Sequence, residues 1–179
     1  MKIIKIDKNN LVNGAGCRCV LWISGCSWNC SKCHNKEAQN PELGKTYNEE
    51  HWKEIEKQLK NPNIDGITFT GGDPLFENNR EVVAYLLKKI KENFPNKNIW
   101  MWTGFIFEDI INTFPEIKYV DVLVDGLYVD SLNPRKRNLR YRGSLNQRVI
   151  NVKESLEKNE IIFWQDLDGW TSQKDYEIK

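Results

Sequence analysis

Short apolar segments alternate with segments of helical periodicity along most of this chain, and this alternation restricts its fold more than any other feature. The stretches typical of strands are residues 20–23, 66–70, 99–102, 120–124 and 161–164. The stretches that predict helices are residues 48–60, 80–91 and 108–114. Such alternation predicts parallel strands joined by helical crossovers. A complete β/α barrel needs about 250 residues, so the 179 residues present predict a partial, open β/α barrel with four to five parallel strands.

Composition and charge exclude several classes of protein. Hydrophobic residues make up 40% of the chain and charged residues 28%, which excludes a disordered or fibrous protein. Lys and Arg total 26 against 25 Asp and Glu, and this balance argues against a nucleic-acid-binding surface. No apolar run approaches the roughly 20 residues of a membrane span, and the first residues lack the apolar core of a signal peptide. We therefore expect a cytoplasmic protein with no nucleic-acid or membrane partner.

Each expected strand is followed by a turn that contains glycine or aspartate. These turns are Ser24-Gly25-Cys26, Gly71-Gly72-Asp73-Pro74, Thr103-Gly104, Asp125-Gly126 and residues 165–169. The carboxyl ends of parallel strands meet at one edge of a sheet, where sites form in α/β folds. One such turn by itself does no more than end a strand. Five of them, with cysteines beginning in the first, predict a functional site at that edge.

Three cysteines, Cys26, Cys30 and Cys33, stand close together with the spacing C-x3-C-x2-C. An odd total of five cysteines in an expected reducing compartment favours metal binding over disulfides. Thiolates are the usual ligands of iron–sulfur clusters, and three of them leave one iron of a cubane cluster open to an outside molecule. A structural zinc site is the alternative, with Cys17 or Cys19 as its fourth ligand. Otherwise Cys17 and Cys19 are expected to be small buried residues.

The cysteine spacing followed by an aromatic side chain, here His34, resembles the signature of radical S-adenosylmethionine enzymes. Further motifs occur in order at residues 13–18 (NGAGCR), 70–75 (TGGDPL), 100–104 (WMWTG), 121–126 (DVLVDG) and 142–148 (RGSLNQR). Together they resemble the activating proteins of anaerobic (class III) ribonucleoside-triphosphate reductases. The resemblance implies a radical S-adenosylmethionine domain over residues 1–150 and a C-terminal extension, 151–179, that packs on it or continues it.

Two positions depart from the usual family pattern. Ala15 stands where the family often has proline, and His34 where it usually has tyrosine. His34-Asn35 is similar to the activator of pyruvate formate-lyase, so an activator of another glycyl radical enzyme is an alternative. A zinc-stabilised module that holds a partner is an alternative from a different class.

The resemblance implies a [4Fe-4S] cluster and S-adenosylmethionine as cofactors of an oxidoreductase. Reductive cleavage of S-adenosylmethionine gives a 5′-deoxyadenosyl radical, which takes a hydrogen atom from a glycine of the reductase. The implied partners are the glycyl radical subunit of the reductase and a flavodoxin-type electron donor. Cys26, Cys30 and Cys33 would hold the cluster, while Lys32 and His34, which flank Cys33, would contact the adenine.

The resemblance also implies cofactor contacts in the later turns. Gly71 and Gly72 would let the backbone approach the methionine part closely. Asp73 would accept from its ammonium group or hold the turn, and Thr103 and Asp125 would contact the nucleoside or hold their turns. No side chain is expected to act as a catalyst, because the cofactors carry the radical chemistry.

Two further features of the sequence have an expected role. Residues 135–142, the basic segment, carry five positive charges and predict either a solvated loop or a docking surface for the reductase, with nucleic-acid binding a third reading. Trp28 stands between Cys26 and Cys30 and is expected to shield the cluster from solvent.

Overall fold

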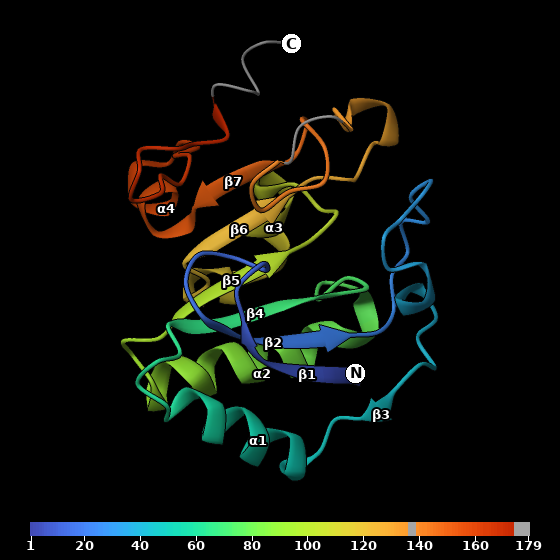
Figure 1. Cartoon of the computed structure of the whole chain (residues 1–179), viewed down its shortest axis with the longest axis vertical. Helices are drawn as coiled ribbons and strands as arrows, with labels where there is room; N and C mark the ends of the chain where they lie inside the picture. Colours follow the sequence, from blue (N-terminus) through green and yellow to red (C-terminus); the bar gives the residue numbers. More distant parts are fainter. Residues whose placement is uncertain (136–138, 174–179) are drawn as a thin grey trace.

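The computed structural model describes residues 1–135 and 139–173. Its strands are β1 (Lys2–Asn10), β2 (Arg18–Ile23), β3 (Lys45–Thr46), β4 (Gly66–Gly71), β5 (Asn98–Trp102), β6 (Val122–Asp125) and β7 (Arg148–Asn151). Across the described residues they form a single open sheet in the order β3-β1-β2-β4-β5-β6-β7 (Figure 1). The four central strands, β2, β4, β5 and β6, are parallel, and β1, β3 and β7 pair antiparallel with their neighbours. The expected α/β class with four parallel strands is therefore confirmed.

The fifth parallel strand expected at residues 161–164 is wrong. The chain there runs back along β7, with Phe163 in an isolated antiparallel bridge to Ile150 and the N–H of Trp164 donating to the carbonyl of Val149 at 2.8 Å. The short helix α4 (Val152–Lys158) separates this segment from β7. A parallel return needs a crossover of about a dozen residues or more, so the connection after β7 permits only an antiparallel one.

Three helices cover one face of the sheet, and all three were expected. They are α1 (Glu49–Leu59), α2 (Glu77–Asn93) and α3 (Phe107–Thr113), with the 3₁₀ turns η1 (Lys36–Gln39), η2 (Pro115–Tyr119) and η3 (Asp130–Leu132) between elements. Asn48 starts α1, because its side chain accepts from the N–H groups of Glu50 and His51. Nowhere in residues 1–135 or 139–173 does a helix combine the length and apolar character that crossing a membrane requires.

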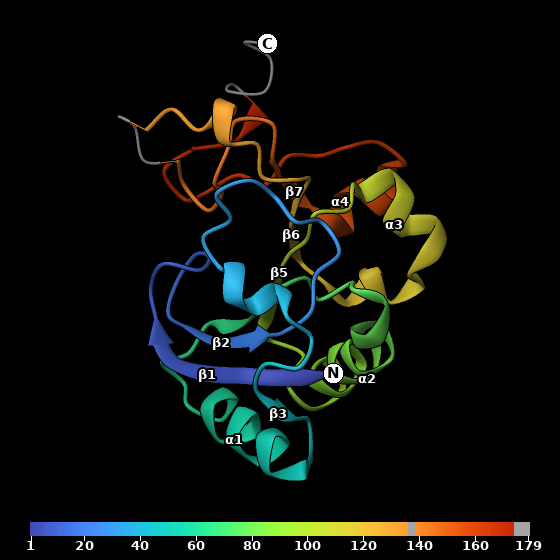
Figure 2. The same ribbon diagram turned by 90° about the vertical axis from the view of Figure 1, so that its right-hand side faces the viewer.

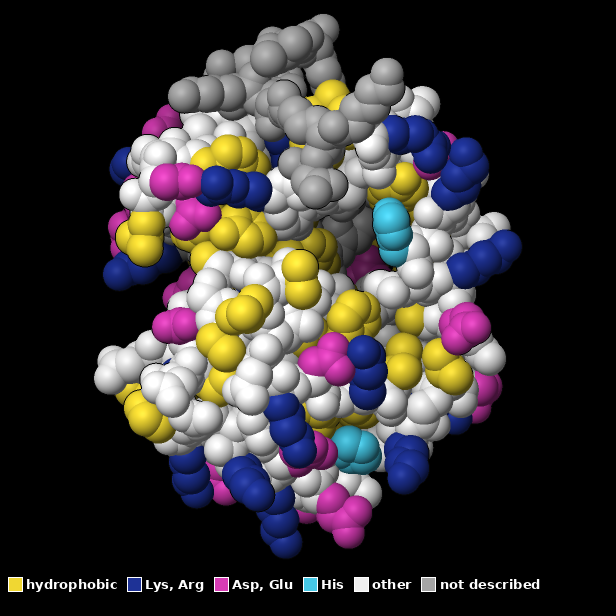
Figure 3. Space-filling model, viewed as in Figure 1, with side chains coloured by type: hydrophobic (Ala, Val, Ile, Leu, Met, Phe, Trp, Pro, Cys, Tyr) yellow, Lys and Arg dark blue, Asp and Glu magenta, His cyan; other side chains and the backbone are white. Residues whose placement is uncertain are grey.

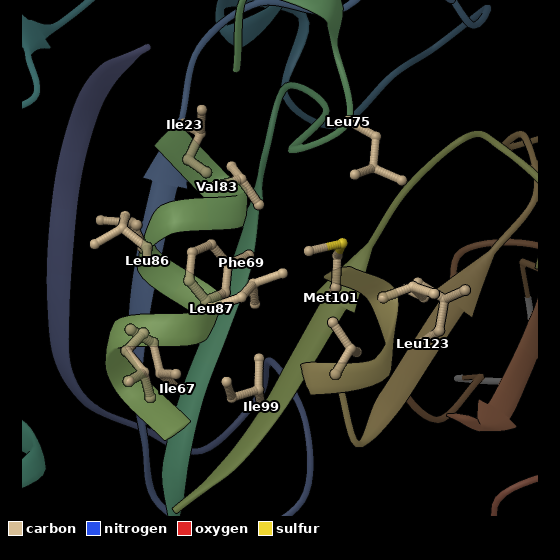
Figure 4. Packing of buried hydrophobic residues seen from close by; sticks show 14 of the residues in the cluster. Ile23, Ile67, Phe69, Leu75, Val83, Leu86, Leu87, Ile99, Met101 and Leu123 are labelled. Carbon is tan, nitrogen blue, oxygen red and sulfur yellow. The ribbon is translucent and has the colours of Figure 1, made fainter. Parts of the chain in front are cut away.

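The main core lies between these helices and the sheet. Alternate side chains of each strand point to it, as Phe69 of β4 and Met101 of β5 do in Figure 4, where they face Val83 and Leu87 of α2. All four are fully buried. Burying one large apolar side chain stabilises a fold by roughly 1.5–3 kcal/mol, so this layer holds the parallel strands in register.

The other face of the sheet carries a fully buried arginine. Arg18 donates to Thr68 Oγ1 at 2.7 Å, to Asn98 Oδ1 at 2.6 Å and to the carbonyl of Ile67 at 2.8 Å. Burial lowers the pKa of Arg18 to about 10, so the guanidinium stays charged at neutral pH. These bonds tie the beginnings of β2, β4 and β5 together.

An aromatic cover lies over the same face, nearer β6 and β7. It consists of Trp100, Trp102, Tyr141, Trp164 and Trp170, packed on Val122, Val124 and Val149. Trp100 and Trp164 stand edge to face with ring centroids 4.9 Å apart. Trp164 and Trp170 of the C-terminal segment therefore pack on the same sheet, and residues 174–179 lie outside the described residues.

Candidate functional site

A cavity of about 190 Å³ lies at the carboxyl ends of the parallel strands. Four of the five expected turns line it: the cysteine loop (residues 26–33) after β2, residues 71–73 after β4, Thr103-Gly104 after β5 and Gly126 after β6. In Figure 2 the segment after β2 passes in front of β5 and β6. The turn at residues 165–169 is not among the lining residues, so the expected convergence is right for four turns and wrong for the fifth, which follows the antiparallel segment.

The three clustered cysteines all line this cavity and are partly exposed. Burial raises the pKa of the Cys26 thiol to about 11 and also raises that of Cys30. Backbone N–H groups oppose this effect, since Trp28 donates to the sulfur of Cys26 and Tyr128 to that of Cys30. Both thiols are therefore protonated at neutral pH without metal, and metal binding must release their protons.

Cys17 and Cys19 belong to a different part of the molecule. Cys19 is fully buried on the helix-covered face of β2, as expected, whereas Cys17 is partly buried and donates its N–H to Asp65 at 2.7 Å. A strand rises about 3.3 Å per residue, so β2 holds Cys17 away from the cysteine loop. Neither residue joins the other three cysteines, and the zinc alternative loses its proposed fourth ligand.

The donor set suits a cluster better than a single ion. Among the described residues, no three His, Cys, Asp or Glu side chains are placed to hold one metal ion. A cubane cluster is different, because each cysteine binds a separate iron and the sulfurs need not converge on one point. Three thiols around one cavity fit that requirement.

Gly71 and Gly72 allow the loop after β2 to lie directly on the turn after β4. Gly71 has φ +121°, and a Cβ there would lie 2.3 Å from the carbonyl oxygen of Ile23. At Gly72 a Cβ would lie 2.3 Å from the oxygen of Gly25 and 2.7 Å from that of Ala38. The close approach that the structure shows is thus between two segments of the chain, and both glycines also line the cavity.

Asp73 is the most connected polar side chain of the site. It is 1% exposed, and its carboxylate accepts from the backbone of Leu75 and Gly104, the hydroxyl of Thr103 and the indole of Trp28. Burial raises the pKa of Asp73, while the four donors favour the ionised form. Of the two roles expected for Asp73, holding the turn is the one that the structure displays, and it engages Thr103 as well.

Asp125 does not line the cavity of the cysteines. Its carboxylate accepts from Arg148 Nε at 3.0 Å and from the N–H of Phe107 at 2.8 Å. Arg148 also binds both oxygens of Glu108, at 2.9 and 2.7 Å, and holds the pKa of Glu108 below its usual value. Asp125 therefore ties the end of β6 to α3 and β7 and faces a neighbouring cavity.

The two residues beside Cys33 separate in space. His34 is exposed and lines the cavity, with its ring edge to face with Tyr128 at a centroid distance of 5.7 Å. The side chain of Lys32 turns away and forms an ion pair with Asp130 at 3.0 Å.

Sequence reasoning missed several residues that line the cavity, namely Asn35, Gln39, Trp102, Tyr128, Gly143 and Gln147. Tyr128 follows the expected Asp125-Gly126 turn by two residues, which is the one signal that indicated it. Gln147 reaches the site through packing between distant segments, since its Nε2 donates to the carbonyl of Gly126 at 3.0 Å. Nothing local in the sequence predicts that contact, and the only signal for Gly143 and Gln147 was their place in the 142–148 motif that contributes to the resemblance.

The described arginines of the basic segment have partners within the chain. Arg135 donates to Asp130 at 2.6 Å, and Arg140 pairs with Asp168 at 2.7 Å. Residues 136–138 of this segment lie outside the described residues. Basic and acidic side chains are interspersed on the face shown in Figure 3.

Comparison with known proteins adds independent findings. Residues 12–150 match the family described as a 4Fe-4S single cluster domain. The chain is 40% identical over 160 residues to the anaerobic ribonucleoside-triphosphate reductase-activating protein of Enterobacteria phage T4, covering 89% of this chain and 100% of the relative. Proteins of the same name from Pasteurella multocida (35% over 155 residues; 83% and 96% covered) and Escherichia coli K12 (33% over 147 residues; 80% and 94% covered) also match. The resemblance to these activating proteins is thereby confirmed, and the chain belongs to the family of anaerobic ribonucleoside-triphosphate reductase-activating proteins.

Proposed function

We propose that this chain uses a [4Fe-4S] cluster and S-adenosylmethionine to generate a glycyl radical on an anaerobic ribonucleoside-triphosphate reductase. The observation that carries the proposal is three thiols of one loop around one cavity, with Cys17 and Cys19 elsewhere. The match to a 4Fe-4S single cluster domain supports the metal group, and the names of the relatives support the partner.

The proposed cluster ligands are Cys26, Cys30 and Cys33, which leave one iron for S-adenosylmethionine. When bound, the two cofactors supply a one-electron reductive cleavage whose radical removes hydrogen from a glycine of the partner. The chain itself binds both groups, orients them and excludes water. We further propose that the open sheet serves as a partial β/α barrel of the radical S-adenosylmethionine type, with residues 1–150 as its domain.

For S-adenosylmethionine we propose the part of the cavity beside the cysteine loop. The backbone of Gly71 and Gly72 suits the methionine part, and the exposed ring of His34, with the backbone of Lys32, suits the adenine. We keep as predicted contacts of S-adenosylmethionine the residues Asp73, Thr103 and Asp125, although their side chains also have partners within the chain. A flavodoxin-type electron donor and a cytoplasmic location are proposed on sequence grounds.

The test is an anaerobic reconstitution with iron and sulfide, followed by S-adenosylmethionine, a reductant and the purified reductase. We expect a brown protein, 5′-deoxyadenosine as a product and a glycyl radical signal on the reductase by electron paramagnetic resonance. Cys30→Ala is the control that should give none of these. A colourless protein with one tight zinc contradicts the proposal. A parallel assay replaces the reductase with pyruvate formate-lyase. A radical on pyruvate formate-lyase and none on the reductase identifies the chain as the alternative activator.

A further inference from the structure

We propose that Asp73 is a positioning residue, whose buried carboxylate fastens the indole of Trp28, and with it the cysteine loop, to the turn after β5. The inference rests on the proposed function in one respect, which is that this loop carries the proposed cluster ligands.

The carboxylate of Asp73 accepts all of its hydrogen bonds from other groups of the chain. Oδ2 accepts from Trp28 Nε1 at 2.8 Å and from the N–H of Gly104 at 2.9 Å. Oδ1 accepts from the N–H of Leu75 and from Thr103 Oγ1, both at 2.8 Å. Hydrogen bonds to an ionised acceptor are roughly twice as strong as neutral ones. One carboxylate thus joins the turns after β4 and β5 to the cysteine loop.

A second observation supports the same contact independently. A Cβ at Gly104 would lie 2.5 Å from both Cδ1 and Nε1 of Trp28, so the glycine there lets the indole lie against the backbone. Phe105 packs its ring edge to face with Trp28, with centroids 4.7 Å apart. The turn after β5 therefore provides a shaped seat for this indole, and Asp73 supplies its polar end.

The position of the Trp28 indole restricts the orientation of the Cys26 and Cys30 thiols. Trp28 stands two residues from Cys26 and two from Cys30, so fixing its side chain limits the motion of both. Two further side chains of the cysteine loop have partners outside it: the sulfur of Cys30 accepts from the N–H of Tyr128, and Lys32 forms an ion pair with Asp130. The lysine is 66% exposed, and exposed ion pairs contribute little. Losing the indole contact would therefore loosen the loop between Cys26 and Cys30.

The indole also borders two cavities. Trp28 and Gly104 line both the cavity of the cysteines and a second one of about 560 Å³ that Phe105 and Arg148 help to line. Displacing the ring would admit water beside the cysteine loop. Solvent exposure is one of the factors that set the potential of an iron–sulfur cluster.

The first test follows hydrogen–deuterium exchange of residues 26–33 in the metal-free protein. Trp28→Phe keeps a ring but removes the donor, and we expect exchange there to become about tenfold faster, as for the loss of a hydrogen bond to a charged acceptor. Trp22→Phe is the matched control, because Trp22 Nε1 donates to Asp7 Oδ2 at 2.7 Å on β1. It should leave exchange of the cysteine loop unchanged.

Asp73→Asn and the double variant Trp28→Phe/Asp73→Asn complete the cycle. If both single changes remove the same contact, the hydrogen bond between Trp28 and Asp73, the loop of the double variant exchanges no faster than that of Asp73→Asn alone. Additive effects contradict the inference, and so does unchanged loop exchange in Trp28→Phe. If Asp73→Asn does not fold, the comparison of loop exchange between Trp28→Phe and Trp22→Phe decides whether the inference holds.

The second test measures the reduction potential of the reconstituted cluster. We expect Trp28→Phe to shift it to less negative values, because water stabilises the extra charge of the reduced form, and Trp22→Phe to leave it unchanged. An unshifted potential in Trp28→Phe overturns the positioning role. The exchange experiment needs no cluster, cofactor or partner, so failure of the proposed function and failure of this inference give different results.

Discussion

The role open to each cysteine depends on whether it precedes, belongs to or follows β2. Cys19 points into the layer of helices, where burial raises the pKa of its thiol to about 12. The three cysteines after the strand reach the cavity. The motif spacing predicted that these three thiols lie together, because a short loop with three thiols needs little help from the rest of the chain to bring them to one place.

Substitution of single cysteines tests that division. Cys26→Ala, Cys30→Ala and Cys33→Ala are each expected to abolish stable cluster binding, since a cubane held at two corners loses iron. Cys17→Ala and Cys19→Ala should keep the iron and sulfide content of the parent after anaerobic reconstitution. A Cys19→Ala variant as poor in iron as Cys30→Ala would show that the ligand set is wrong.

Cys19 also gives the metal-free protein a pH dependence. Its folded-state pKa of about 12 lies above the ordinary cysteine value of 9.0, so between these values the folded chain binds more protons than the unfolded chain. The free energy of unfolding therefore falls as pH rises above about 9, by at most about 1.4 kcal/mol per pH unit from this thiol. Urea titrations at pH 8 and pH 11 should show a smaller fall for Cys19→Ala. Equal falls would contradict the assignment.

At the level of elements, the sequence predicted the central strands and missed the edges. β2 and β4 read as nearly continuous apolar or β-branched runs because both faces of a parallel strand are covered. β1 carries Lys2, Lys5 and Lys8 among its apolar residues, and β7 has four residues, so neither gave a clear pattern. The cavity residue Gln147 was missed for the same reason, since it precedes an edge strand that was not foreseen.

The contact between the turn after β4 and the loop after β2 makes a prediction at this scale. Gly72→Ala forces a methyl group toward two carbonyl oxygens, and overpacking of this kind costs about 1–3 kcal/mol. We expect that loss in urea unfolding together with weaker cluster binding. Gly169→Ala is the control, because its Cβ would meet its nearest neighbour at 3.6 Å and its positive φ costs about 1 kcal/mol. Equal effects on cluster binding would show that the close contact at Gly72 is unimportant.

At the scale of the whole molecule, segments far apart in sequence close one face of the sheet. Ala15, Tyr141, Trp164 and Trp170 all pack on the strands that end at the cavity. Composition indicated many tryptophans, but which of them share a face depends on contacts between residues far apart in sequence, such as Trp100 and Trp164. No local pattern reports such contacts, so the aromatic cover was not predicted.

A pair of substitutions in the C-terminal segment tests the importance of that cover. Trp164→Ala removes a ring in contact with Trp100 and Tyr141, and we expect a loss of about 2–4 kcal/mol in the free energy of unfolding. Leu167→Ala changes a side chain that is fully exposed, and it should stay within about 0.5 kcal/mol of the parent. A silent Trp164→Ala would mean that the segment rests on the sheet without stabilising it.

The fastening of Trp28 to Asp73 and Gly104 has a consequence for how the protein is made. The cysteines leave the ribosome within the first fifth of the chain, whereas the groups that seat their loop are synthesised much later and come together only when β4 and β5 have paired. Iron delivered to the nascent cysteines would meet an unsupported loop, so maturation of the metal centre should follow release of the chain rather than accompany its translation.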